Sequence, residues 1–166
     1  FNEGAERAIN VKIPYGSILN PRPRAPVRAR LLPSYRVVNA VMKALGEAVP
    51  ERVIAPGFDT TSVCCLSHKL ADGYNIYLEI FGGGFGAGPN YDGCDAVDSM
   101  LSNCSNIPIE SMESDYPFFR VEDYSLRSSS GGNGKFRGGM GFQKTYKILS
   151  DYVTFATYGD RFRIAP

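Results

Sequence analysis

Residues 62–82 have the sequence SVCCLSHKLADGYNIYLEIFG, in which two strand-like halves flank a turn-forming tripeptide. Its two halves, 62–70 and 74–82, are rich in β-branched and aromatic residues, which favour extended strands. Between them lies Ala71-Asp72-Gly73, whose Asp-Gly step suits the tight turn of a hairpin. The sequence therefore predicts an antiparallel β-hairpin at the centre of the chain.

Further strands are predicted on both sides of this hairpin. On the C-terminal side, 120–127 is strand-like, and 142–149 and 152–159 flank Ser150-Asp151, which predicts a second hairpin. On the N-terminal side, residues 7–13 alternate loosely and suit a short strand. The prolines of 14–26 forbid a regular helix, so an extended arm is expected there.

Two helices are expected among these strands. Apolar residues at helical spacing predict a helix over 35–49, with Ser34 as its N-cap and Pro50 marking its end. A shorter helix is predicted over 95–106. Strands outnumber helices, so the expected fold class is α+β, with a strand-rich antiparallel sheet and a few short helices.

Composition limits the chain to one domain or part of one. With 166 residues, 43% of them hydrophobic, the chain can bury one ordinary core. A net charge of +1 provides no general field for nucleic acid or an anionic membrane, and no apolar run approaches the roughly 20 residues of a membrane-spanning helix. Adjacent Cys64 and Cys65 suit reduced thiols better than a disulfide framework, which favours a cytoplasmic location.

Both ends of the sequence suggest a larger polypeptide. The chain begins with FNEG, without an initiator Met, and it ends with DRFRIAP directly after a strand-like run. We therefore expect residues 1–166 to be a single partial domain, a fragment of a longer chain.

Two glycine clusters admit two interpretations, which are close backbone packing and phosphate binding. Their members are Gly82, Gly83, Gly84, Gly86 and Gly88 in the first cluster, and Gly131, Gly132, Gly134, Gly138, Gly139 and Gly141 in the second. A P-loop fails around Gly134-Lys135 because Ser129 and Phe136 break the pattern, and a dinucleotide-binding turn fails because Pro89 stands where the third glycine belongs. We therefore expect no nucleotide site within this segment.

Polar residues around these clusters are candidates for a substrate pocket. Amides orient polar ligands, a buried carboxylate relays protons, and a guanidinium binds a carboxylate or phosphate through two hydrogen bonds. The alternatives are helix capping, solvation, and a salt bridge from the arginine to Glu110 or Glu113. The pocket candidates are Asp92, Asn103, Asn106, Glu110 and Arg137. His68 lacks a second ligand at metal-binding spacing, so no metal ligand is assigned.

Three long motifs together resemble the hydantoinase B/oxoprolinase family. They are GGGFGAGPNYDGCDA (82–96), NCSNIPIESMESDYP (103–117) and SSSGGNGKFRGGMGFQKTY (128–146), and VKIPYGSILNPRPRAPVRAR (11–30) extends the resemblance upstream. The resemblance corresponds to the C-terminal portion of a B-type polypeptide and covers nearly the whole chain.

The resemblance implies a role in an ATP-dependent cyclic amide hydrolase of the 5-oxoprolinase or N-methylhydantoinase type. The expected partners are a hydantoinase A-type ATP-binding subunit or domain, the remainder of the B-type chain, and a small cyclic amide. ATP would bind to the A-type partner, and a divalent metal would bind to the N-terminal half of the B-type chain, so the isolated fragment is expected to be inactive. Two alternatives stay open: a part of an ATP-dependent acetone or acetophenone carboxylase, and a purely structural assembly domain.

Overall fold

The computed structural model describes residues 4–27, 30–98, 100–102, 106–160 and 163. The predicted central hairpin is confirmed. Strand β1 (Ser62–Lys69) pairs in antiparallel register with β2 (Tyr74–Phe81), and Leu66 lies opposite Tyr77. The turn closes where the Leu70 N–H donates to the Gly73 carbonyl oxygen at 2.8 Å.

The predicted second hairpin is wrong, although both of its strands exist. Strand β4 (Phe142–Ile148) pairs with β3 (Phe119–Leu126), whereas β5 (Val153–Tyr158) pairs with β1. The result is a three-stranded sheet in the order β2-β1-β5 and a separate β3-β4 pair. The link over 149–152 therefore carries the chain from one sheet to the other.

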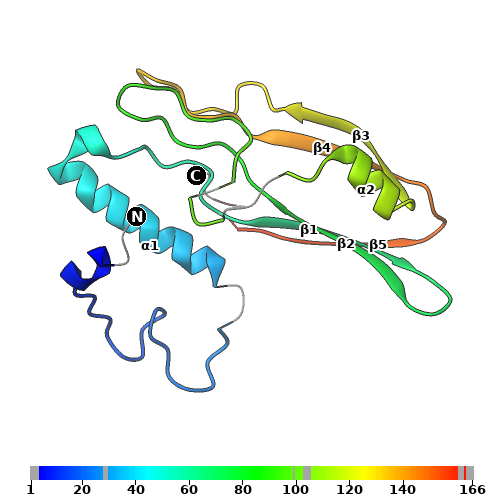
Figure 1. Cartoon of the computed structure of the whole chain (residues 1–166), viewed down its shortest axis with the longest axis horizontal. Helices are drawn as coiled ribbons and strands as arrows, with labels where there is room; N and C mark the ends of the chain where they lie inside the picture. Colours follow the sequence, from blue (N-terminus) through cyan, green and yellow to red (C-terminus); the bar gives the residue numbers. More distant parts are fainter. Residues whose placement is uncertain (1–3, 28–29, 99, 103–105, 161–162, 164–166) are drawn as a thin grey trace.

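The core lies where the two sheets and helix α2 (Ile109–Asp115) meet (Figure 1). Alternate residues of β1 face this core, and Met112 of α2 is fully buried in it. The buried side chains are Cys64, Leu66, Tyr77, Met112, Phe118 and Phe119. The described chain combines α-helices with sheets whose strands all pair antiparallel, which confirms the α+β class.

The short helix was predicted too early in the sequence. Of the predicted range, residues 99 and 103–105 lie outside the described part of the chain. Residues 95–98, 100–102 and 106 form turns, a bridge and irregular structure, and the helix begins only after Pro108. Proline presets the backbone dihedral at the start of a helix, and burial of Met112 then fixes the following turn against the core.

The long helix α1 (Leu31–Ala48) starts earlier than predicted and ends before Pro50, as expected. Ser34 lies inside the helix rather than at its N-cap, and its hydroxyl donates to the Arg30 carbonyl oxygen at 2.8 Å. A short 3-10 helix, η2 (Pro50–Arg52), follows. None of the described helices is long and apolar enough to cross a membrane.

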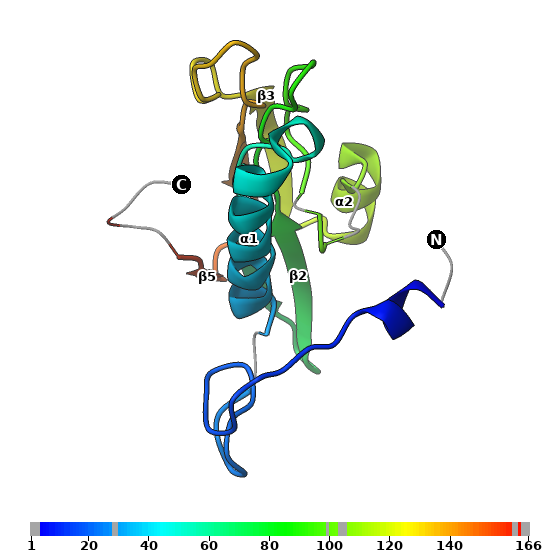
Figure 2. The same ribbon diagram turned by 90° about the vertical axis from the view of Figure 1, so that its left-hand side faces the viewer.

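The N-terminal segment lies apart from the sheets (Figure 2). It contains a 3-10 helix, η1 (Ala5–Ala8), and then an exposed stretch over 9–16 that joins no sheet among the described residues. The strand predicted for 7–13 is therefore wrong. The proline-rich part forms tight turns, with Gly16 at φ +84° and its N–H donating to the Asn20 carbonyl oxygen.

Candidate functional site

The two glycine clusters pack backbone against backbone at one end of the sheets. Within the first segment, the Phe85 N–H donates to the Cys94 carbonyl oxygen at 3.0 Å. Between the two segments, the Gly139 N–H donates to the Phe85 carbonyl oxygen at 2.7 Å. A third bond joins the Gly93 N–H to the Arg137 carbonyl oxygen at 2.8 Å. We call this contact between 82–96 and 131–141 the glycine junction.

Several positions in the glycine junction have no room for a side chain, and Gly139 and Gly86 are two of them. A Cβ on Gly139 would overlap the Cys94 carbonyl oxygen, and a Cβ on Gly86 would overlap that of Ala55. Both obstacles are backbone atoms, which cannot rotate away as a side chain can. The junction therefore accounts for glycine at these two positions without any phosphate ligand.

Arg137 holds the glycine junction together through two carboxylates. Its guanidinium makes a bidentate contact with Asp95, at 2.7 and 3.1 Å, and its backbone N–H donates to Asp92 at 2.8 Å. Asp95 also accepts the Met140 N–H at 2.7 Å. The salt bridge considered from the sequence, to Glu110 or Glu113, is therefore wrong.

The same contacts shift two pKa values. The hydrogen bond from Arg137, followed by the bond from the Met140 N–H, lowers the pKa of Asp95. The Asp95 carboxylate in turn raises the pKa of Arg137. The charged forms of both residues are thus favoured, and the ion pair persists over the neutral pH range.

Of the four predicted pocket residues that the structure describes, Asp92 and Arg137 are brought together. Asn106 and Glu110 are exposed, and Glu110 lies in the first turn of α2. Asn103 lies outside the described residues.

Other groups that the sequence singled out have contacts within the fold. Glu113 accepts the Val121 N–H at 2.9 Å, and the His68 ring stacks on Phe118. Within the described ranges, no group of three or more His, Cys, Asp or Glu side chains is placed to hold a metal ion.

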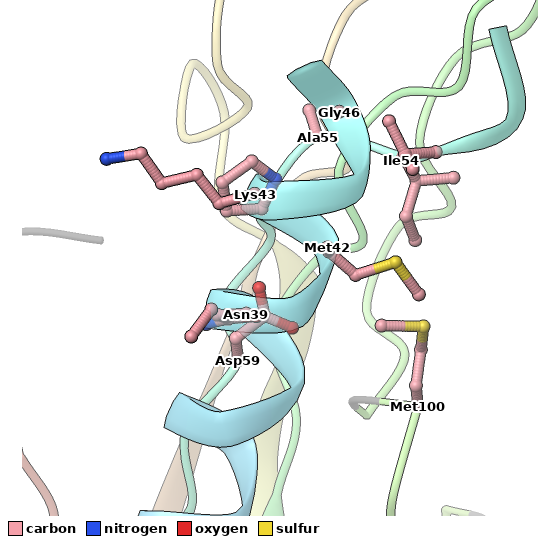
Figure 3. Close-up of a pocket in the computed structure, with 11 residues that line it drawn as sticks. Asn39, Met42, Lys43, Gly46, Ile54, Ala55, Asp59 and Met100 are labelled. Carbon is pink, nitrogen blue, oxygen red and sulfur yellow. The ribbon is translucent and has the colours of Figure 1, made fainter. Parts of the chain in front are cut away.

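A cavity of about 610 Å³ lies beside α1, and it was not predicted from the sequence (Figure 3). Its lining is mostly apolar, and its polar members are Asn39, Lys43 and Asp59. In Figure 3, Met42 and Met100 point toward one another, and Asp59 lies at the level of Asn39 along the helix. An apolar cavity of this size with a few polar groups is typical of a small-molecule site.

Each wall of the cavity comes from a different part of the chain. Asn39, Met42 and Gly46 recur at helical spacing on α1 and form one wall. The facing segment, 53–56, is fixed to the first glycine cluster by the Ala55 N–H, which donates to the Ala87 carbonyl oxygen at 2.8 Å. The glycine junction therefore helps to position the cavity.

Asp59 is the most constrained polar residue of the cavity. It is buried, and it adopts a left-handed backbone conformation with φ +41°. Its side chain accepts the Gly57 N–H at 2.6 Å. Strained, buried polar residues cluster at functional sites. The sequence around Asp59 did not identify it as a site residue. The other lining residues Asn39 and Met100 are distant from it in the chain, so no local motif connects them.

Comparison with known proteins places this chain in a family. The family model of hydantoinase B/oxoprolinase matches residues 1–166, so the chain belongs to the hydantoinase B/oxoprolinase family. The resemblance seen in the sequence motifs is thereby confirmed.

Three relatives indicate the range of the family. The chain is 37% identical to a protein of Pseudomonas sp. (strain NS671) provisionally named as the B-type component of a D-/L-hydantoinase, over 99% of the chain and 27% of that protein. It is 34% identical to 5-oxoprolinase of Dictyostelium discoideum, over 92% of the chain and 11% of the relative. It is 30% identical to the beta subunit of caprolactamase from Pseudomonas jessenii, over 96% of the chain and 29% of that subunit. The chain thus spans less than a third of the length of each of these relatives.

Proposed function

We propose that this chain is part of an ATP-dependent cyclic amide hydrolase, of the 5-oxoprolinase or N-methylhydantoinase type. One observation carries the proposal: nearly the whole chain matches relatives whose names refer to hydantoin, 5-oxoproline and caprolactam. These three compounds share a ring that contains an amide bond. The common chemistry, rather than any one of the compounds, is what we transfer to this chain.

Within this proposal, the cavity beside α1 holds the ring. A volume of about 610 Å³ accommodates a five- or seven-membered ring, and the apolar wall suits its methylene groups. The Asn39 amide offers both a donor and an acceptor to the amide of the ring. Asp59 offers a carboxylate, which accepts an N–H or relays a proton. The glycine junction, with Asp92 and Arg137, supports the far wall.

Exposed apolar side chains support a role at an interface. Val37, Val41 and Leu45 are exposed at a spacing of four residues on α1, and Ile76 and Leu78 are exposed on β2. Apolar patches of this kind on a folded domain mark contact surfaces. We propose that they face the remainder of a B-type polypeptide and a hydantoinase A-type partner.

ATP and the divalent metal belong, in this proposal, to other parts of the complex. ATP would bind to the A-type partner and activate a carbonyl by phosphorylation, and the metal would bind to the N-terminal half of the B-type chain. The described residues contribute pocket walls and hydrogen-bonding groups. We therefore expect the segment alone to be inactive.

The complete complex of A-type and B-type polypeptides provides the test. ATP hydrolysis should rise when 5-oxoproline, hydantoin or caprolactam is added, without any requirement for bicarbonate. ATP hydrolysis that requires bicarbonate together with acetone or acetophenone would favour the carboxylase alternative instead.

The scaffold alternative is tested by Asp59→Asn, which keeps the side-chain shape and tolerates the left-handed backbone. Lost amide-stimulated turnover in an intact complex would contradict a purely structural role. Unchanged turnover would support that role. The matched control is Asp72→Asn, because Asp72 is exposed in the turn between β1 and β2.

A further inference from the structure

Strand β5 forms an edge of the three-stranded sheet, and within the described part of the chain it pairs on one side only, with β1. In Figure 2, β5 and α2 lie on opposite sides of the sheet. Five of the six residues of β5 are exposed, and only Val153 is partly covered. Phe155 is 61% exposed, although its partner in β1, Leu66, is only 3% exposed. The layer that covers β1 therefore does not extend over most of β5.

The sequence of β5 lacks the features that protect an exposed edge. A free edge offers unpaired backbone groups to any other strand, so proteins usually protect it with charges, proline or a bulge. Strand β3 has a bulge between Val121 and Asp123, and β4 carries the exposed Lys147. Strand β5, with the sequence VTFATY, has no charge, no proline and no bulge. Such a strand is typical of a position inside a sheet rather than at its edge.

The register of β1 shows which of its backbone groups face β5. The Leu70 N–H donates to the Gly73 carbonyl oxygen, so the backbone groups of Leu70 are directed toward β2. Successive residues of a strand direct these groups to opposite sides, so those of Leu66 are also directed toward β2. The backbone groups of Cys65 and Ser67 are therefore directed toward β5.

The same register identifies the free groups of β5. Ala156 pairs with Cys65 and Thr154 with Ser67, so the N–H and carbonyl groups of Ala156 and Thr154 are directed toward β1. The intervening residues direct their N–H and carbonyl groups to the other side, where no described strand lies. These residues are Val153, Phe155 and Thr157.

The exposed area of the chain indicates how large the missing partner is. The chain exposes 12209 Å², whereas a folded monomer of 18.2 kDa exposes about 8,000 Å². The N-terminal segment and β5 both contribute to the excess, since most of their residues are exposed. An excess of this size matches the area that obligate interfaces bury, about 2,000 to 5,000 Å². A permanently attached partner fits this area better than a short peptide does, and the chain covers only 27% of its relative from Pseudomonas sp. (strain NS671).

We propose that β5 pairs along its free edge with a β-strand from the remainder of the B-type polypeptide. The added strand accepts the N–H groups of Val153, Phe155 and Thr157 and extends the sheet beyond β5. Its centre is uncharged and apolar, because it lies beside Phe155 on one face of the sheet and Ala156 on the other. This inference rests on one part of the proposed function, that the chain belongs to a longer B-type polypeptide, and it requires no cyclic amide.

Hydrogen exchange in the complete B-type polypeptide, read at single residues by mass spectrometry, tests the pairing. The amides directed away from β1 should exchange at least about 100-fold more slowly than amides of the exposed turn at 71–73. Their exchange should be as slow as that of Thr154 and Ala156, which face β1. The amides in question are those of Val153, Phe155 and Thr157.

Two variants at one position show whether a backbone hydrogen bond causes the slow exchange. Phe155→Pro removes the side chain and the N–H, whereas Phe155→Ala removes the side chain only. Proline is tolerated at an unpaired edge, so a paired edge should distinguish the two variants. Exchange at Val153 and Thr157 should be about tenfold faster or more in Phe155→Pro than in Phe155→Ala. Equal exchange in the two variants would contradict the pairing. If Phe155→Pro does not fold, exchange in the unsubstituted polypeptide decides.

The source of the added strand is identified by comparing the monomeric B-type polypeptide with its dimer and with its complex with the A-type partner. Slow exchange of the three amides in the monomer supports the inference. Fast exchange in every state would overturn it, and so would slow exchange found only in a dimer or only with the A-type partner. The proposed function fails separately, if the complete complex shows no ATP hydrolysis stimulated by a cyclic amide while the three amides still exchange slowly.

Discussion

Lys144 Nζ lies 2.7 Å from Oε1 of Glu79, and the two side chains are only 2% and 6% exposed. Glu79 belongs to β2 and Lys144 to β4, so this ion pair joins the two sheets across the core. The Tyr146 hydroxyl donates to Glu79 at 2.8 Å, and the Tyr77 hydroxyl is a further donor to it. Lys144 Nζ also lies 4.3 Å from the centre of the Tyr124 ring. The buried charges are therefore fully partnered.

Breaking this buried ion pair should lower the free energy of unfolding far more than breaking an exposed ion pair. Lys144→Met leaves the Glu79 charge buried without its partner, so we expect the free energy of unfolding to fall by about 3 to 5 kcal/mol. Lys147→Met is the control on the same strand, because Lys147 and Glu122 are 3.4 Å apart and about half exposed. The control should change stability by less than about 1 kcal/mol. Urea unfolding measures the change in the free energy of unfolding for both variants. Equal changes would contradict the prediction that the buried ion pair contributes more to stability than the exposed one.

Alkaline pH should destabilise the chain through the same core. Burial raises the pKa of the Cys64 thiol to about 11, and burial followed by hydrogen bonding raises the pKa values of Tyr77 and Tyr146. The unfolded chain therefore releases these protons at a lower pH than the folded chain. Stability is fully present below about pH 9 and falls as the pH rises above it.

Urea unfolding at about pH 7.5 and about pH 10.5 measures this alkaline effect, since the two values lie on either side of the unfolded thiol and phenol pKa values. Cys64→Ala should reduce the difference between the two pH values, because one of the buried acids is removed. Tyr152→Phe should leave the difference unchanged, since Tyr152 is exposed. A protein that is equally stable at both pH values would contradict the prediction.

The glycine junction should tolerate a methyl group at one glycine and reject it at another. Gly139→Ala places a Cβ onto the Cys94 carbonyl oxygen, whereas Gly132→Ala meets nothing within 4 Å. We expect Gly139→Ala to lower the free energy of unfolding by about 2 to 4 kcal/mol, and Gly132→Ala to change it by less than about 0.5 kcal/mol. Thermal unfolding compares the two. Similar unfolding temperatures for the two variants would contradict the prediction, because the junction would then accommodate a Cβ at residue 139 without loss of stability.

The Arg137 contacts should control local opening of the glycine junction. Asp95→Asn weakens the bidentate contact with Arg137, although the amide oxygen can still accept the Met140 N–H. Hydrogen exchange over 137–141 should therefore become faster, while exchange in β1 stays the same. At acidic pH, protonation of Asp95 should have the same effect. Because its pKa is lowered, this effect should begin only below the usual range for a carboxyl. Unchanged exchange would show that other contacts hold the junction.

Local sequence signals predicted elements but not their partners. The hairpin of β1 and β2 was predictable because Asp72-Gly73 and the flanking strands are contiguous in sequence. The partner of β5 was not, because its pairing with β1 joins segments that are far apart in the chain. Helix α2 was misplaced because burial of Met112, rather than a local capping signal, fixes its position.

The candidate site was predictable only in part, for a similar reason. The two glycine-rich motifs pointed to the segments that form the glycine junction, where the Arg137 backbone N–H donates to Asp92. The cavity brings together Asn39, Asp59 and Met100, which no motif connects.

The most direct test of the proposed function is ring opening of 5-oxoproline, hydantoin and caprolactam by the complete complex, with and without Asp59→Asn. The proposed function predicts ATP-dependent opening of at least one ring, and a loss of about tenfold or more in kcat/KM when the Asp59 carboxylate is replaced. A complex that opens none of these rings in the presence of ATP would contradict it.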